Sequence, residues 1–398
     1  MSHAVGHFDI LVLGGGNAGL SAAARLIRKG VRDVALIEPQ SVHTYRPLLS
    51  YVGGGQARQH TAERTQRSVT PRECTWIQDS AVVVDPERST VQCASGRQYH
   101  YGDLVVGTGL VPDDTELPGI DAALESPAVT SNYLDRAQKT WALVSTLRAG
   151  ARAVFTVPRA PVSCTGTTIK PLFLAVDHWR RTGRLDSLDL TLVVDRPQLL
   201  GVPELDVRIA DALQRIGVRV LYDTRVESVD AGRRSVTVVR DAHREQLDFD
   251  LLHLVPPFRG PAWVGHCGLA GAHPHGLVDI DAATLRHRTH DNIWSAGDGA
   301  AVDTDPSGGA LRRQVSVLVD NLSAARRGQV LSDYDGYTVA PVAIDGRHLV
   351  AGEFDRSGTL ASSLPSFLDS TKPRRSAWAF DRYVLPQMYW HQILKGRV

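Results

Sequence analysis

The amino-acid sequence predicts an α/β fold: two nested Rossmann-like domains of the dinucleotide-binding type, followed by a small C-terminal segment. Three observations predict it. An apolar run at residues 8–13 leads into a glycine-rich turn and then into a stretch of helical composition. A second apolar run at residues 34–37 completes a βαβ unit of the usual size. From about residue 130 the alternation of helix and strand patterns starts again, which indicates a second α/β unit inserted into the first.

The local pattern of apolar and polar residues predicts each helix and strand. The first unit contains the two apolar strands, the helix between them, which closes on Gly30, and a buried strand within YGDLVVGTG at residues 101–109. In the inserted unit we expect a helix at 133–147, a strand at 153–157, a helix at 170–182, a strand at 190–194 and a helix at 206–216. A strand at residues 292–299 and a helix at 311–326 return the chain to the first unit.

Composition excludes several classes of protein. The chain has 398 residues with 44 Lys and Arg against 43 Asp and Glu, so its net charge of +1 provides no field for nucleic acid. No apolar run approaches the roughly 18 residues of a membrane span, and the N-terminal stretch lacks the cationic start of a signal peptide. Four cysteines without a CxxC pair predict neither a disulfide scaffold nor a zinc site. We expect a cytoplasmic protein, in solution or peripherally at a membrane.

The glycine-rich turn GGGNAG at residues 14–19 predicts a pyrophosphate site. Gly14 permits the tight turn, Gly16 lets the backbone approach the phosphates, and Gly19 lets helix and strand pack closely, with the helix N-terminus facing the ligand. Glu38, about 20 residues further on, is placed to accept both ribose hydroxyls. Its carboxylate would repel a 2′-phosphate, which favours FAD or NAD over NADP.

Two later motifs favour FAD. NIWSAGDG at residues 292–299 resembles the second FAD fingerprint of two-dinucleotide-fold flavoproteins, in which the aspartate, here Asp298, holds the ribityl chain. LVVGTG at residues 104–109 resembles the accompanying ATG-type motif. The expected FAD-binding residues are Gly14, Gly16, Asn17, Ala18, Gly19, Glu38, Pro39, Arg46, Pro47, Thr108, Gly109, Gly297 and Asp298.

These motifs divide the chain into four segments. We expect the first part of the FAD-binding domain at residues 1–112 and the inserted Rossmann-like domain at 113–275. The second part of the FAD-binding domain is expected at 276–330, and an interface or membrane-proximal segment at 331–398.

The inserted domain lacks the glycines of a second dinucleotide site. Where NAD(P)H-dependent relatives carry a second GxGxxG, this chain reads AVFTVPRAPVSCTGTTIK, so we expect no NAD(P)H there. Cys164 takes that position, with Lys170 six residues on, and this setting could lower the pKa of the thiol and make it nucleophilic. A half-buried structural cysteine is the alternative, and the residues alone leave both open.

Other cysteines and histidines give weaker signals. His266, Cys267, His273 and His275 fit no tight zinc spacing, so we expect a surface loop and no metal site. Packing roles are expected for the remaining two cysteines, Cys74 and Cys93.

Five segments together resemble the sulfide:quinone oxidoreductases, specifically the branch with the mitochondrial enzymes, within the FAD-dependent pyridine nucleotide-disulfide oxidoreductases. They cover nearly the whole chain in order: EPQSVHTYRPLLSYVGGG (38–55), TVPRAPVSCTGTTIKPLFLAVDHWRRTG (156–183), DLLHLVPPFRGP (250–261), TLRHRTHDNIWSAGDG (284–299) and YDGYTVAP (334–341). The resemblance implies that Cys164 is the sulfur-accepting or flavin-attacking thiol, that Lys170 is a cation near it, and that Pro256, Pro257 and Pro261 belong to a flavin-side loop. In that family a second cysteine pairs with the first, sulfide opens the disulfide, and electrons pass through FAD to a quinone.

The chain departs from that pattern at the second redox cysteine. Its position, directly after the GD of the second FAD motif, holds Gly299, so the two-cysteine relay is absent. Cys267 is the other cysteine that could approach Cys164. The Ser-Lys-Thr pattern expected near a quinone is replaced by PSGGALRRQ at residues 306–314, which leaves oxygen open as an acceptor beside quinone.

The sequence thus predicts an FAD-dependent oxidoreductase that oxidises sulfide or a small sulfur nucleophile with Cys164 and passes electrons to quinone or oxygen. The alternatives are a repurposed flavin oxidase or biosynthetic enzyme acting on another small molecule, and a noncatalytic flavin-binding protein. The segment YVLPQMYWHQILKG at residues 383–396 predicts packing or a homodimer contact, with peripheral membrane attachment as the alternative. His43 and Arg46 are expected either to contact substrate or to lie in a loop packed against the flavin.

Overall fold

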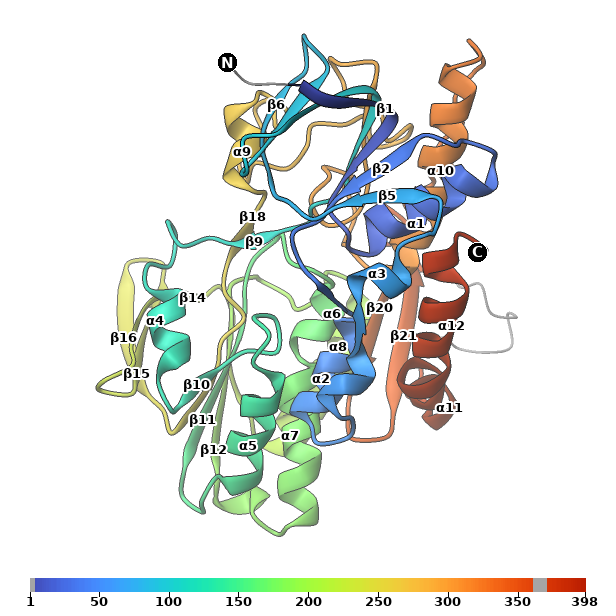
Figure 1. Cartoon of the computed structure of the whole chain (residues 1–398). Coiled ribbons are helices and arrows are strands. Elements are labelled where there is room, and N and C mark those ends of the chain that lie inside the picture. Colours follow the sequence, from blue (N-terminus) through green and yellow to red (C-terminus); the bar gives the residue numbers. More distant parts are fainter. Residues whose placement is uncertain (1–3, 361–370) are drawn as a thin grey trace.

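The computed structural model describes residues 4–360 and 371–398. The larger of its two main sheets has seven strands, which come from distant parts of the chain (Figure 1). Its strands, in sheet order, are β5 (Cys74–Ile77), β2 (Val34–Ile37), β1 (Ala4–Leu13), β8 (Gln98–Val106), β7 (Thr90–Cys93) and β6 (Ala81–Asp85), with β19 (Ile293–Ser295) also paired to β8. β5, β2, β1, β8 and β19 run parallel, which confirms the predicted βαβ start, with α1 (Asn17–Arg28) as its helix.

The pairing register brings the predicted motifs to one edge of this sheet. One row of paired residues runs across four strands near their carboxyl ends: Leu13, Ile37, Val106 and Ser295. The glycine-rich turn, Glu38, the Gly107 turn and the GDG turn follow directly after this row. Ligands of open α/β sheets bind outside the carboxyl ends of the strands, so the register alone assembles a dinucleotide site.

A second sheet of five parallel strands forms the core of the inserted unit. In sheet order its strands are β10 (Val129–Thr130), β17 (Leu251–His253), β11 (Arg152–Val157), β12 (Asp189–Val194) and β13 (Arg219–Leu221). The expected helices are present as α5 (Ala137–Thr146), α7 (Lys170–Arg181) and α8 (Pro203–Ile216). Their apolar faces cover the sheet, which is why the strands read as continuous apolar runs.

Some elements differ from expectation. The helix predicted from residue 133 begins only at Ala137, and the strand predicted over residues 292–299 ends at Ser295. It ends there because Gly297 has a φ of +86°, outside the range of a strand. The sequence patterns did not predict β5, β6, β7, β10, β13 and β17. They also did not predict these further short or antiparallel elements: β3 (Val42–Thr44), α2 (Pro47–Gly53), β4 (Glu63–Thr65), α3 (Gln66–Val69), β9 (Val111–Pro112), α4 (Ile120–Glu125), α6 (Thr165–Thr168), β14 (Arg225–Asp230), β15 (Ser235–Arg240), β16 (His243–Asp248), β18 (Phe258–Arg259) and α9 (Ala262–His266).

Residues 331–360 and 371–398 pack on both units (Figure 1). The hairpin of β20 (Thr338–Ala343) and β21 (Leu349–Phe354) buries Ala340 and Val342 in the core of the inserted unit. Its turn is held by Asp345, whose carboxylate accepts two backbone N–H bonds. Next come α11 (Arg375–Ala379), a π-helical turn (Phe380–Val384) and α12 (Leu385–His391), which packs against the core of the first unit.

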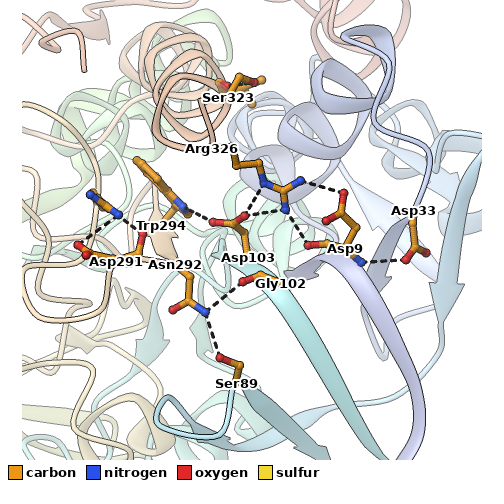
Figure 2. A network of polar contacts seen from close by, with 12 residues as sticks. Asp9, Asp33, Ser89, Gly102, Asp103, Asp291, Asn292, Trp294, Ser323 and Arg326 are labelled. Carbon is orange, nitrogen blue, oxygen red and sulfur yellow. Dashed lines mark hydrogen bonds and ion pairs between the residues drawn. The ribbon is translucent and has the colours of Figure 1, made fainter. Parts of the chain in front are cut away.

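A polar network fixes α10 (Gly308–Ala325) against the first sheet (Figure 2). The Arg326 guanidinium at the end of this helix donates to Asp9 of β1 at 2.8 Å and to Asp103 of β8 at 2.6 Å. Trp294 of β19 donates its indole N–H to the same Asp103. The other end of α10 therefore lies at the carboxyl edge, where Gln314 accepts the Gly297 N–H at 2.9 Å. In the described residues no helix is long and apolar enough to cross a membrane.

Candidate functional site

The glycine-rich turn has the geometry that a pyrophosphate requires. Gly14 has a φ of +93°, and a Cβ there would lie 2.7 Å from the Gly107 carbonyl oxygen. A Cβ at Gly19 would lie 1.9 Å from the Gly14 carbonyl oxygen. At Gly16 a Cβ would meet no atom within 4 Å, and this residue precedes α1 without a side-chain cap. Exposed N–H groups at an open helix start suit phosphate, so these residues fit the diphosphate of FAD.

Glu38 is held at the end of β2 by backbone donors. The Gly15 N–H donates to Oε2 and the Gln40 N–H to Oε1, each at 2.7 Å. A carboxylate oxygen accepts more than one hydrogen bond, so the side chain keeps acceptor capacity for ribose hydroxyls.

The remaining predicted cofactor residues lie around the same edge. Gly109 has a φ of +68° with open space beside it, and Thr108 lies against Gly14. The methyl group of Ala18 lies beside Gly297, and the Asn17 side chain accepts from Ser21 at 3.0 Å. Two proline positions frame the loop after β2: Pro39 is exposed, and Pro47 opens α2.

Arg46 and His43 have protein partners. The exposed Arg46 guanidinium donates to the Tyr133 carbonyl oxygen and to Asp135, both at 3.1 Å, and so links the first unit to the inserted one. His43 is buried, and both of its ring nitrogens are hydrogen-bonded: Nδ1 to the Gly15 carbonyl oxygen at 3.0 Å and Nε2 to the Tyr389 hydroxyl at 2.7 Å. Both ring nitrogens are occupied, so His43 is a packing residue that joins the glycine-rich turn to α12.

Cys164 lies at the carboxyl edge of the second sheet, in a backbone conformation rare for a side-chain-bearing residue. Its φ is 61° and its ψ 92°. The Thr167 hydroxyl donates to its Sγ at 3.1 Å, and the Tyr133 hydroxyl to its carbonyl oxygen at 3.3 Å. The neighbouring Ser163 hydroxyl donates to the Asp298 carboxylate. The turn that carries the thiol is therefore hydrogen-bonded to the aspartate of the second FAD motif.

Of the two interpretations left open for Cys164, the one that relies on a lowered thiol pKa is wrong. Burial raises the pKa of the thiol to about 12, and the nearby Asp305 carboxylate raises it further than Lys170 lowers it. The Lys170 ammonium, fully buried, instead lies 2.8 Å from Asp381 Oδ2 in the π-helical turn. The Tyr51 hydroxyl donates to the same oxygen at 2.6 Å. Lys170 therefore forms a buried ion pair that joins α7 to the C-terminal helices.

Asp305 is a site residue that the sequence patterns missed. It accepts bonds from the Thr165 hydroxyl and, at 3.2 Å, from the Thr165 N–H, directly beside Cys164. Burial raises the pKa of its carboxyl group to about 6. The available signal was its place just before PSGGALRRQ, where the chain departs from the family pattern.

In the inserted unit, side chains fill the space at the carboxyl ends of the strands of the five-stranded sheet, where a nicotinamide dinucleotide would place its phosphates. The Arg196 guanidinium donates to the Pro158 carbonyl oxygen at 2.8 Å and to the Thr165 hydroxyl at 3.1 Å. The first N–H of α6 is taken by Asp305, and a Cβ at Gly166 would lie 3.1 Å from Val342 of β20.

The other cysteines lie in different surroundings. Cys74 and Cys93 are buried in the core of the first unit, which confirms their packing roles. Cys267 Sγ accepts the Val84 N–H of β6 at 3.1 Å, and all four cysteines are free thiols. The described residues contain no group of three or more His, Cys, Asp or Glu arranged for a metal ion.

Gly299 is sterically required where the second redox cysteine was expected. A Cβ there would lie 2.7 Å from the Gly109 carbonyl oxygen. We expect Gly299→Ala to lower the free energy of unfolding by about 1–3 kcal/mol, because overpacking against backbone forces a shift. Chemical denaturation measures this. Gly265→Ala is the matched control, since a Cβ there meets nothing within 4 Å; equal effects of both substitutions would contradict the prediction.

The C-terminal segment is partly core. Tyr389 and Trp390 are buried, which fits the packing expectation for residues 383–396. Phe380, Tyr383 and Val384 are 46%, 55% and 46% exposed, so contact of this face with a membrane or a second chain stays a prediction.

Several known proteins are similar to this chain. Residues 8–157 match the pyridine nucleotide-disulphide oxidoreductase family. The mitochondrial sulfide:quinone oxidoreductase of Dictyostelium discoideum is 30% identical over 392 residues, covering 98% of this chain and 86% of that protein. The mouse enzyme of the same name is 28% identical, covering 98% and 87%. The sulfide:quinone oxidoreductase structure from Aquifex aeolicus superposes with a TM-score of 0.81 at 18% identity, covering 98% and 92% of the two chains. The chain therefore belongs to the sulfide:quinone oxidoreductase family and is an FAD-dependent oxidoreductase.

Proposed function

We propose that this protein oxidises sulfide at Cys164 and passes the electrons through FAD to a quinone. The observation that carries the proposal is the hydrogen bond from Ser163 to Asp298, because it fixes the thiol-bearing turn to the FAD motif. The strained backbone of Cys164 supports it, since such strain persists where the surrounding structure holds a functional side chain in place. The donor and the acceptor, sulfide and quinone, are those for which the similar enzymes are named.

The chemistry needs one thiol. The Cys164 thiol and a hydrosulfide ion form an S–S bond, leaving a Cys164 persulfide, one proton and two electrons. Bound FAD supplies the two-electron acceptor. A second sulfur nucleophile then takes the outer sulfur, breaks the S–S bond and leaves the Cys164 thiolate. These reaction steps need no second cysteine, which agrees with the glycine at position 299.

Two side chains serve the thiol. We assign the thiol proton to the Asp305 carboxylate as the S–S bond forms, because this carboxylate is bonded to Thr165 beside Cys164 and, with a pKa of about 6, is ionised at neutral pH. The Thr167 hydroxyl stabilises the thiolate through its bond to Sγ.

An anaerobic titration of the FAD-loaded protein with sulfide tests this function. We expect the flavin absorbance to bleach, and a short-chain quinone to restore it faster than oxygen does. An unchanged spectrum under excess sulfide would exclude sulfide as the donor. Faster recovery with oxygen would assign the second acceptor that the altered 306–314 segment leaves open.

A second candidate is oxidation of a different small donor. Gly299 favours it, because the steric clash of a Cβ with Gly109 excludes a cysteine relay at this position. Bleaching by small organic thiols or other donors in the same titration, without bleaching by sulfide, would select it.

The pH dependence of the rate of flavin reduction should follow the ionisation of Asp305. Burial raises the pKa of this carboxyl group from 3.8 to about 6. The group is therefore ionised, and able to take the thiol proton, only above about pH 6, so the rate of flavin reduction should rise as the pH increases through 6. Asp305→Asn should remove this rise and lower the plateau rate about 10²-fold or more. Stopped-flow reduction between pH 5 and 8 measures it. Exposed Asp303→Asn is the control; loss of the pH step in that variant, or its survival in Asp305→Asn, would overturn the assignment.

A further inference from the structure

A cavity of about 820 Å³ lies at the opposite end of α1 from the glycine-rich turn. Its walls are the last turns of α1, the segment at residues 67–73 that leads into β5, and residues 395–397. A helix of 12 residues is about 18 Å long, so this cavity is well separated from the site that the FAD motifs form. It also lies where β5 begins, at the amino edge of the sheet.

The cavity concentrates positive charge. Five cationic side chains line it against one carboxylate, Glu73: Arg28, Arg67, Arg72, Lys395 and Arg397. In the part of the chain that the structure describes, none of these five lies within 4.0 Å of a carboxylate, whereas the adjacent Lys29 pairs with Asp320 at 2.5 Å. The whole chain carries a net charge of only +1, so this cluster is local.

The cluster offers a surface for an anion, because Arg28, Arg67, Arg72 and Arg397 are exposed to solvent. Like charges around one cavity repel each other, and the protein supplies one carboxylate to offset them. Arginine guanidinium groups bind phosphate oxygens in bidentate fashion, and four of the five cations are arginines. The cavity volume is within the range of small-molecule sites.

The lining also has an apolar part. Ala24, Ile27 and Pro71 contribute it beside the arginines. We propose that this cavity binds a small organic molecule carrying two or more phosphate groups, with Arg28 and Arg72 holding the phosphates and Ile27 contacting its apolar part. This inference is independent of the function proposed for Cys164.

Calorimetry on the FAD-saturated protein tests the proposal, because bound FAD blocks the dinucleotide site. We expect ADP and inorganic pyrophosphate to bind with 1:1 stoichiometry at an ionic strength of about 0.05 M, and at least 10-fold more weakly at about 0.3 M. The double variant Arg28→Gln/Arg72→Gln should weaken binding at least 10-fold. Arg148→Gln/Arg180→Gln, which removes two exposed arginines outside the cavity, should leave it unchanged.

A second arm distinguishes a soluble molecule from a lipid headgroup. Vesicles of phosphatidylcholine with 30% phosphatidylglycerol, about a third anionic, are sedimented with the same variants. Binding of ADP or pyrophosphate supports the proposal, whereas binding of vesicles alone, lost in Arg28→Gln/Arg72→Gln, would overturn it in favour of an anionic lipid surface. No binding in either arm, or binding that the double variant retains while its melting temperature and flavin spectrum are unchanged, would overturn the proposal.

Discussion

Cys164→Ser should lower the rate of sulfide-dependent flavin reduction roughly 10³-fold or more, as loss of a catalytic nucleophile does in other enzymes. A serine hydroxyl cannot form the S–S bond through which the electrons leave sulfide. The thiol accepts a hydrogen bond from Thr167 at 3.1 Å, on a turn that is bonded to Asp298. Anaerobic stopped-flow absorbance of the FAD-loaded variant measures the rate.

Cys267→Ser is the matched control for this prediction. Its sulfur accepts the Val84 N–H of β6, away from the Cys164 turn, so we expect the wild-type rate to within a factor of about two. A similar loss in both variants would show that Cys267 takes part in the sulfur chemistry. A rapid rate in Cys164→Ser would show that sulfide reduces the flavin without this thiol.

Asp381→Asn should lower the free energy of unfolding by about 3–5 kcal/mol, because it leaves a buried ammonium without its counter-charge. The Lys170 side chain is 0% exposed and that of Asp381 7%. The substitution also weakens the bond from the Tyr51 hydroxyl, which joins α2 to the same carboxylate. Chemical denaturation followed by tryptophan fluorescence measures the loss.

An exposed ion pair provides the control. Lys29 and Asp320 are 41% and 46% exposed, so Lys29→Met should change stability by about 0–1 kcal/mol. Lys170→Met/Asp381→Leu should recover at least half of the loss, since an apolar pair removes both buried charges. If this double variant is stable and reduces its flavin at the wild-type rate, Lys170 is a structural residue; a rate loss of 10-fold or more would restore its predicted catalytic role.

The sequence by itself determined the first βαβ unit, the FAD motifs and their order, and the position of Cys164. These features are local, because a glycine spacing, an apolar run or a motif within about ten residues is enough to predict the structure that it forms. The resemblance to a family also came from contiguous segments, and the missing second cysteine was visible as Gly299.

Tertiary structure alone decided the environment of the thiol. Ser163 and Asp298 are 135 residues apart, and Lys170 and Asp381 are 211 apart, so no local pattern relates them. Spacing alone placed Lys170 near Cys164, but burial next to Asp381 directs its charge to the C-terminal helices. The raised pKa of Cys164 has the same origin, because desolvation and the approach of Asp305 exist only once the two sheets, α10 and the hairpin of β20 and β21 have packed together.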